Sequence, residues 1–215
     1  MSKRAVILAG GKGTRLKPYT VSLPKPLVPI VDKPILEIII QQLAKNGFDC
    51  ITLTTNHMAD IIKAFCGDGS KWGVSIDYSQ EDRPLSTMGP LKLIPDLPED
   101  FLVMNGDVLT DLDYNDFYNH HIKMNSIFTI SSFEREHINN YGVLEVNKNS
   151  TLVDFKEKPS VKFEVSMGVY MVNKEILDYI PENTAYGFDN LMFDLLKSKK
   201  TVNVKKHNSY WLDIG

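Results

Sequence analysis

Short apolar runs in the first half of the chain alternate with stretches whose apolar residues recur every three or four positions. The short runs predict buried strands, at residues 5–9, 49–55, 74–78 and 101–104. The periodic stretches predict helices, at residues 35–46, 59–66, 88–94 and 114–124. Pro34 suits a first helical turn and Asn46-Gly47 a helix end. Strands separated by helical crossovers predict a mainly parallel sheet covered by helices on both faces.

The second half of the chain is richer in strand patterns. Alternating apolar and polar positions predict strands, at residues 127–133, 166–172, 202–206 and 209–212. Residues 142–146 and 152–156 predict a hairpin around Asn147-Lys148-Asn149, and two helices are expected near 174–180 and 189–198. We find no repeat or linker, so the expectation is an α/β fold in which residues 1–215 form one domain.

Composition narrows the classes of partner. The 215 residues are 24% charged and 43% hydrophobic with a net charge of -3, which gives no reason to expect nucleic acid as a partner. No apolar stretch could span a bilayer and no signal peptide precedes the first strand. We therefore expect a cytoplasmic protein without a membrane partner. The two cysteines, Cys50 and Cys66, are interpreted as small apolar residues.

The candidate chemistry begins directly after the first predicted strand. Residues 10–15 read Gly-Gly-Lys-Gly-Thr-Arg, and residues 24–27 read Pro-Lys-Pro-Leu. A buried strand that enters a glycine-rich turn lets backbone N–H groups approach a phosphate closely, and Arg15 and Lys25 add positive charge. The pattern is neither a Rossmann fingerprint, whose third glycine would fall on Leu16, nor a P-loop. It predicts a triphosphate site, with a plain glycine turn as the alternative.

These two motifs together resemble the signature of the sugar-1-phosphate nucleotidyltransferases, in particular mannose- or manno-heptose-1-phosphate guanylyltransferases. The resemblance implies a Rossmann-like nucleotide-diphospho-sugar transferase fold. It also implies transfer of a nucleoside monophosphate from an NTP to a sugar 1-phosphate, with release of pyrophosphate. The implied catalytic residues are Arg15, Lys25, Asp107 and Lys158. The implied nucleotide-binding residues are Leu8, Gly10, Gly11, Gly13, Thr14, Glu81 and Thr87.

Two carboxylates are candidate ligands for Mg²⁺. Asp107 follows the apolar run 101–104 and Asn105-Gly106, and Mg²⁺ prefers one or two carboxylates together with phosphate oxygens. The segment resembles the metal-binding segment of the family, although a plain Asn-Gly turn is the alternative. Asp213, in Trp-Leu-Asp-Ile-Gly, resembles the second ligand. Asp111 is an unresolved competitor, and Asp113 is predicted to cap the helix 114–124.

The sugar side of the site is implied by the resemblance alone. Glu157-Lys158-Pro159 resembles a motif whose Glu contacts sugar hydroxyls and whose Lys contacts the sugar phosphate. Gly142 and Ser166 complete the implied sugar-phosphate site, with Ser166 standing where the family usually has Asn. In the segment 80–90, Ser86, Met88 and Pro90 replace the glycine and alanines that are common in the family. The added side chain of Ser86 predicts a narrower pocket.

No catalytic base is needed for this chemistry, because a sugar 1-phosphate is largely dianionic at neutral pH and is already a nucleophile. The histidines form no catalytic set, and His120-His121 is interpreted as a surface pair. Glu81 favours GTP, because a carboxylate accepts from both the N1–H and the 2-amino group of guanine. The alternatives are a uridylyl-, thymidylyl- or cytidylyltransferase, a non-catalytic nucleotide-sugar sensor, and a glycosyltransferase. The sugar stays open, and so does whether the chain forms a homo-oligomer.

Overall fold

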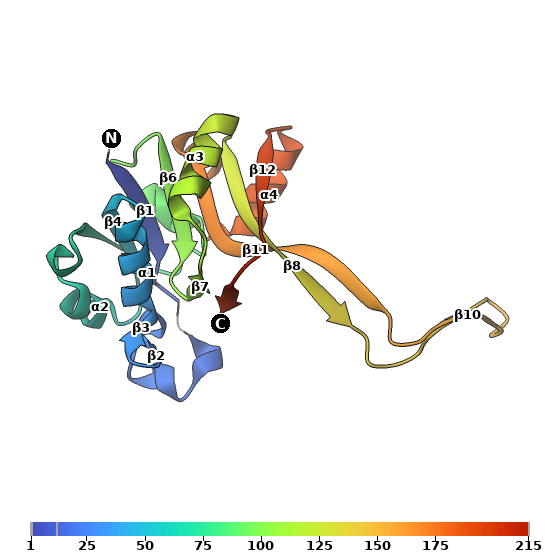
Figure 1. The fold of residues 1–215 in the computed structure, drawn as a ribbon. Coiled ribbons are helices and arrows are strands. Elements are labelled where there is room, and N and C mark those ends of the chain that lie inside the picture. The colour runs from blue at the N-terminus through green and yellow to red at the C-terminus, as the bar shows by residue number, and fades with distance from the viewer. Residues whose placement is uncertain (1, 12, 215) are drawn as a thin grey trace.

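A central sheet of seven strands organises the chain, in the order β12-β8-β11-β6-β1-β4-β5 (Figure 1). The structure is a computed structural model that describes residues 2–11 and 13–214. The sheet strands are β1 (Lys3–Leu8), β4 (Phe48–Thr55), β5 (Ser75–Gln80), β6 (Asp100–Asn105), β8 (Phe128–Ile138), β11 (Ser160–Asn173) and β12 (Val202–His207). β5, β4, β1 and β6 run parallel, and β11 runs antiparallel to both β6 and β8. The predicted mainly parallel mixed sheet is confirmed.

Helices cover both faces of the sheet, and the alternation along each strand explains why. Ala5 and Ile7 of β1 pack into one apolar core and Val6 packs into the other, because successive side chains of a strand point to opposite faces. One face carries α1 (Ile35–Lys45), α2 (Ala59–Cys66) and α3 (Tyr114–Met124). The other carries η5 (Gly89–Leu93), η6 (Lys174–Tyr179) and α4 (Phe188–Lys197). Among the described residues, no helix is long and apolar enough to cross a membrane.

Two predicted helices are 3₁₀ helices instead. Gly89 and Pro90 open η5, and neither residue favours an α-helix beyond its first turn. η6 is only six residues long and is capped by the Asn173 side chain, which accepts from the backbone N–H of Glu175. The structure also contains shorter 3₁₀ helices that the sequence did not predict, at Thr14–Leu16, Tyr19–Val21, Lys25–Leu27 and Ser70–Trp72.

Some short strands outside the main sheet were not expected, and one was expected over a slightly different range. β2 (Pro29–Ile30) pairs with β3 (Lys33–Pro34). β7 (Val108–Thr110) pairs antiparallel with β13 (Trp211–Asp213), which begins two residues later than the predicted strand 209–212. The second pair matters for function, because it brings the end of the described chain beside the segment that follows β6.

A long arm extends from the body of the molecule (Figure 1). β12 ends opposite Phe133, and beyond that point β8 and β11 pair only with each other, so both strands are longer than predicted. The predicted hairpin is confirmed at the far end, as β9 (Val143–Val146) and β10 (Leu152–Lys156). It forms its own two-stranded sheet rather than joining the central one. We call residues 134–165 the arm.

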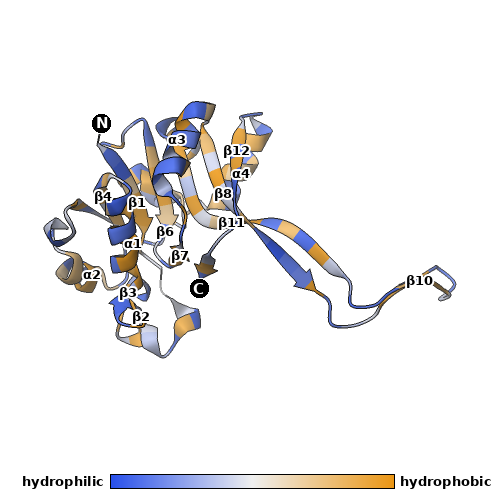
Figure 2. Cartoon of the chain, in the orientation of Figure 1, coloured by the Kyte–Doolittle hydropathy of each residue, from blue (hydrophilic) through white to orange (hydrophobic). Residues whose placement is uncertain are grey.

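The arm contains many hydrophobic residues (Figure 2), and their side chains are exposed to solvent. Each has about half or more of its surface exposed, and they are Ile138, Tyr141, Leu144, Val146, Leu152, Val153, Phe155, Val161 and Phe163. The arm joins the body at an irregular stretch, where three residues of β11, 167–169, lie opposite a single residue of β8. Gly168 lies there with φ +76, a conformation that glycine adopts readily.

Candidate active site

A cavity of about 430 Å³ opens at the carboxyl ends of β1, β4 and β6. Ligands of open α/β sheets bind at this edge, where the loops leave the strands. The lining residues come from five segments of the chain and are Leu8, Gly10, Gly11, Gly13, Thr14, Arg15, Leu16, Lys25, Pro26, Thr54, Asn56, Glu81, Pro84, Ser86, Thr87, Asn105, Gly106 and Asp107. All seven predicted nucleotide-binding residues lie here, together with Arg15, Lys25 and Asp107. Lys12 of the glycine loop lies outside the described residues.

The glycine loop is folded tightly against the segment that follows it. A Cβ on Gly13, whose φ is +59, would lie 2.8 Å from Cγ2 of Thr20 and 3.0 Å from Cβ of Lys25. The Thr20 hydroxyl donates to the carbonyl of Gly13 at 2.6 Å. Both the backbone conformation and the lack of space therefore require glycine at this position. The packing brings Lys25 to the same wall of the cavity as the loop.

Glu81 is a buried carboxylate in the cavity wall, with 8% of its surface exposed. Its Oε2 accepts from the backbone N–H of Leu85 at 2.9 Å. A Cβ on Gly10 would lie 2.9 Å from its Oε1, so only a residue without a side chain allows this close approach. Burial raises the pKa of Glu81, and the hydrogen bond from Leu85 opposes that shift.

Asn56 contributes a polar group that the sequence analysis did not identify. It follows β4 and lines the cavity, and its Nδ2 is buried with no hydrogen-bond partner among the described residues. A buried amide donor without a partner is costly, so a ligand acceptor at this position would be favoured. No motif surrounds Asn56; the only signal in the sequence is a polar residue directly after a predicted strand.

Asp107 and Lys25 form an ion pair at the mouth of the loop. Both side chains are largely buried, and both line the cavity. Gly106 places the pair, because its N–H donates to the carbonyl of Leu8 at 3.0 Å and a Cβ there would lie 3.0 Å from that oxygen. The end of β6 is thus held directly against the end of β1, where the glycine loop begins.

Asp213 is brought next to Asp107 by the pairing of β13 with β7. Asp213 lies opposite Val108 in that pair, and the N–H of Ile214 donates to the carbonyl of Asp107 at 3.2 Å. Asp213 is exposed and lies beside the cavity rather than among its lining residues. Within the described residues, no three His, Cys, Asp or Glu side chains form a metal-binding group. Carboxylates on two neighbouring backbone segments fit a divalent cation that takes its other ligands from phosphates and water.

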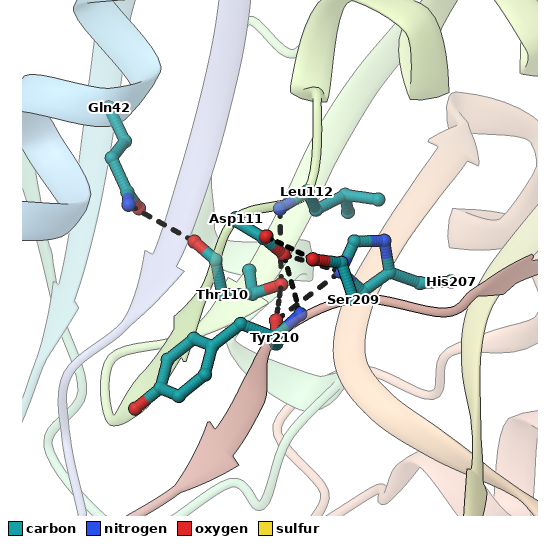
Figure 3. A network of polar contacts seen from close by, with 7 residues as sticks. All are labelled: Gln42, Thr110, Asp111, Leu112, His207, Ser209 and Tyr210. Atoms are coloured by element: carbon teal, nitrogen blue, oxygen red, sulfur yellow. Dashed lines mark hydrogen bonds and ion pairs between the residues drawn. The ribbon is translucent and has the colours of Figure 1, made fainter.

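Asp111, the competing carboxylate, is engaged elsewhere (Figure 3). Its Oδ1 accepts from the backbone N–H of Tyr210 at 2.8 Å and lies 2.7 Å from Nε2 of His207. Its Oδ2 accepts from the hydroxyl of Ser209. The hydrogen bond from Ser209 lowers the pKa of Asp111, with Tyr210 and His207 adding to the shift. The predicted cap is confirmed, because Asp113 accepts from the N–H of Asp116 at 2.8 Å.

The predicted sugar-phosphate residues lie on the arm or at its base. Gly142, Glu157 and Lys158 are exposed residues of the arm, and none lines the cavity. Ser166 is half-buried at the base of the arm, with its Oγ 3.1 Å from the Tyr170 hydroxyl. Lys158 follows β10 closely, but β10 pairs only with β9, so this strand end lies away from the edge of the main sheet at which the cavity opens. The assignment of these residues to a sugar site stays a prediction.

The interpretation of His120-His121 as a surface pair was wrong for His121. Its Nδ1 lies 2.7 Å from Oγ1 of Thr129 and its Nε2 lies 3.2 Å from Oδ1 of Asp100. His121 continues the inward face of α3 that begins with Tyr114 and Phe117, as the helical spacing of three and four residues requires. Burial lowers the pKa of His121.

The fold and the site define an α/β protein with a glycine loop and charged side chains around one cavity, and comparison with known proteins gives its family. A sequence profile described as "Nucleotidyl transferase" matches residues 4–215. The chain is 34% identical to the UTP–glucose-1-phosphate uridylyltransferase of Synechocystis, over 99% of this chain and 60% of that protein. It is 33% identical to the mannose-1-phosphate guanyltransferase of Yarrowia lipolytica, again over 99% of this chain and 60% of that protein. The chain belongs to the nucleotidyl transferase family.

A solved structure supports the same grouping. HddC from Yersinia pseudotuberculosis superposes with a TM-score of 0.77 at 28% identity, covering 99% of this chain and 93% of that one. The form of HddC that is complexed with GMP-PN gives a TM-score of 0.74 at 29% identity. The chain spans about 60% of the length of the two curated relatives described above.

Proposed function

We propose that this chain transfers a nucleoside monophosphate from an NTP, with GTP preferred, to a sugar 1-phosphate and releases pyrophosphate. One observation carries the proposal: a single cavity gathers the glycine loop, Arg15, the Lys25–Asp107 pair and Glu81. These are the parts needed to bind a triphosphate at one end and a base at the other. We further propose that residues 1–215 act as one catalytic domain.

The Lys25–Asp107 pair suits the transfer step. The ammonium group and the carboxylate lie side by side and are largely buried. Neither charge is therefore left unpaired before the substrate binds. Lys25 would turn to the reacting phosphates, and Asp107 with Asp213 would hold Mg²⁺. When bound, Mg²⁺ would neutralise negative charge on the phosphates. Arg15, exposed on the glycine loop, would bind the triphosphate, and Lys158 would bind the incoming sugar phosphate.

The transfer reaction requires that the two phosphate groups be positioned, and it requires no general base. The sugar 1-phosphate attacks the α-phosphorus of the NTP through a phosphate oxygen, and the bond from that phosphorus to pyrophosphate breaks. The attacking oxygen is already ionised near neutral pH, because the second pKa of a phosphate monoester is about 6. The protein has to overcome the repulsion between two anions, which fixed cations in a partly desolvated cavity do efficiently.

The preference for GTP rests on the two polar groups at the base end of the cavity. Oε1 of Glu81 faces Gly10 and would accept from N1–H and the 2-amino group of guanine. Nδ2 of Asn56, which has no partner within the described chain, would donate to an acceptor on the base. The HddC structure complexed with GMP-PN supports this preference. The uridylyltransferase relative keeps UTP as the alternative nucleotide.

The experiment combines each NTP with Mg²⁺ and a panel of hexose and heptose 1-phosphates and measures released pyrophosphate. We expect release only when a sugar 1-phosphate is present, and fastest with GTP. Fastest release with UTP, dTTP or CTP would replace the base assignment but leave the reaction class. If nucleotide-sugar binds but no combination releases pyrophosphate, the chain is a sensor instead. Release of free nucleoside diphosphate from a nucleotide-sugar would identify a glycosyltransferase.

A further inference from the structure

We propose that Asp111 is a positioning residue that holds β13 in register against β7, and thereby holds the Asp213 carboxylate beside Asp107. Asp111 takes part in neither binding nor chemistry itself. The inference rests on the proposed function, because it gives Asp213 the role of second metal ligand. The evidence for the inference is a polar network in which Asp111 accepts hydrogen bonds from residues at the end of β12 and between β12 and β13 (Figure 3).

Several hydrogen bonds hold the segment that connects β12 with β13. Asp111 accepts from the Tyr210 backbone, from the Ser209 hydroxyl and from His207. Its own N–H donates to the Tyr210 carbonyl at 3.3 Å, and the Thr110 hydroxyl donates to the same carbonyl at 2.8 Å. Both backbone groups of Tyr210 are therefore satisfied by residues 110–111. Gln42 of α1 ties the network to the body by donating to the Thr110 carbonyl at 3.0 Å.

The β13–β7 ladder is short, so further contacts are needed to fix the register of β13. The ladder joins only Trp211 to Thr110, Leu212 to Leu109 and Asp213 to Val108. Leu212 and Asp213 are exposed, and Trp211 and Ile214 are only partly buried against the core, so burial specifies the pairing weakly. A slip of one residue in a strand turns every side chain to the opposite face. Such a slip would reverse the face on which the Asp213 side chain lies.

Two side-chain anchors hold this ladder, in addition to the backbone hydrogen bond from Ile214 to Asp107, and they are separable. The Trp211 indole donates to the Met167 carbonyl at 2.9 Å, which fixes the ring. Asp111 fixes the backbone immediately before Trp211. Removing the Asp111 carboxylate should therefore loosen residues 210–214 while the body and the cavity stay intact. The fully occupied carboxylate also explains why Asp111 is a positioning residue rather than a metal ligand.

Asp113 offers a matched control, because it lies in the same loop but serves another element. Asp113→Ala removes the cap of α3, which destabilises that helix, and it leaves the hydrogen bonds of Asp111 untouched. Asp111→Ala and Asp113→Ala should thus differ in what they loosen. Asp111→Asn is the conservative variant, because its amide oxygen can still accept from the Tyr210 N–H.

The first measurement is hydrogen exchange in the full chain without substrate. We expect Asp111→Ala to speed exchange in peptides that cover residues 208–214 while the peptides of β1, β4 and β6 keep the wild-type rate. Asp113→Ala should speed exchange in α3 only. If Asp111→Ala exchanges at the wild-type rate in residues 208–214, the proposal is overturned. Faster exchange throughout the chain would also overturn it.

The second measurement is metal affinity, taken as Mn²⁺ binding by electron paramagnetic resonance in the presence of a GTP analogue that is not cleaved. Loss of a group that orients a metal ligand weakens binding by about tenfold or more, and we expect this for Asp111→Ala, a smaller loss for Asp111→Asn and none for Asp113→Ala. Unchanged Mn²⁺ affinity in Asp111→Ala would refute the positioning role. Both measurements remain decisive even if no sugar 1-phosphate proves to be a substrate, so the two proposals can fail separately.

Discussion

The cavity and the arm are built in opposite ways. In the cavity, polar groups are held by packing and hydrogen bonds: Gly13 has no room for a side chain, Glu81 is hydrogen-bonded, and Lys25 is paired with Asp107. In the arm, apolar side chains such as Leu144 and Phe155 are exposed, and the charged pairs lie in solvent, where they contribute little. The part of the site that we assign to the nucleotide is thus preorganised, whereas the part that we assign to the sugar is not.

This difference teaches how binding energy would be divided. A preorganised cavity binds without ordering new groups, while a group on an exposed two-stranded ribbon must be positioned when the ligand arrives. We therefore expect changes in the cavity to affect turnover and changes in the arm to affect capture of the sugar phosphate. Three predictions test this division, beginning with the largest effect, and a fourth tests the stability of the body that carries both regions.

Asp107→Asn should reduce pyrophosphate release by a factor of about 100 or more while the protein stays folded. The change removes a metal ligand worth several kcal/mol in the transition state, and it keeps the shape of the side chain beside Lys25. Turnover is measured at saturating substrates, with circular dichroism to check the fold. Near-wild-type turnover would reassign Asp107 to a turn and remove the chemistry from the cavity.

Lys25→Ala and Lys158→Ala compare the two regions directly. Lys25 lies in the cavity, so its loss should lower kcat more than it raises either KM, as expected for charge that acts in the transition state. Lys158 lies on the arm, so its loss should mainly raise the KM for the sugar 1-phosphate. Steady-state kinetics with both substrates varied separates the cases. Identical changes in kcat and KM in the two variants would contradict the division of roles between the cavity and the arm.

Glu81→Gln should reduce the preference for GTP over UTP by about one to two orders of magnitude. A two-donor contact to a carboxylate is worth roughly 1.5–3 kcal/mol, and an amide has a single oxygen, which cannot replace both Oε1 toward guanine and Oε2 toward the N–H of Leu85. The ratio of kcat/KM for the two nucleotides is the measurement, and the KM for the sugar 1-phosphate should stay unchanged. A Glu81→Gln protein that keeps the wild-type ratio would show that the base is read elsewhere.

His121 should make the stability of the body fall with acid. Burial lowers its pKa in the folded state, so below the ordinary value of about 6.5 the unfolded chain binds the extra proton. Stability is therefore present above that pH and is lost as pH falls, by at most about 1.4 kcal/mol per pH unit. Denaturant unfolding at pH 8 and pH 5 should show this loss in wild type and a smaller one in His121→Gln. His120→Gln, altered at the neighbouring position, should behave as wild type.

The sequence allowed prediction of what depends on local pattern. The glycine loop, Lys25 and Asp107 each follow a strand or a turn that is visible in the residues themselves, and the cavity gathers them. The pairing of β13 with β7 depends on contacts between residues about a hundred positions apart, such as Asp111 with Tyr210, and no local pattern contains that information. Asn56 and His121 were missed for the same reason, because burial depends on what packs over them.

The pairing of β13 with β7 also has a consequence for the order in which the protein is made. β13 follows every other strand of the described chain, and chains fold from the N-terminus as they are synthesised. A growing chain holds the glycine loop, Glu81 and Asp107 long before Asp213 leaves the ribosome. We therefore expect a nascent chain to bind nucleotide before it can complete the metal site, so that nucleotide turnover waits for the final strand to dock.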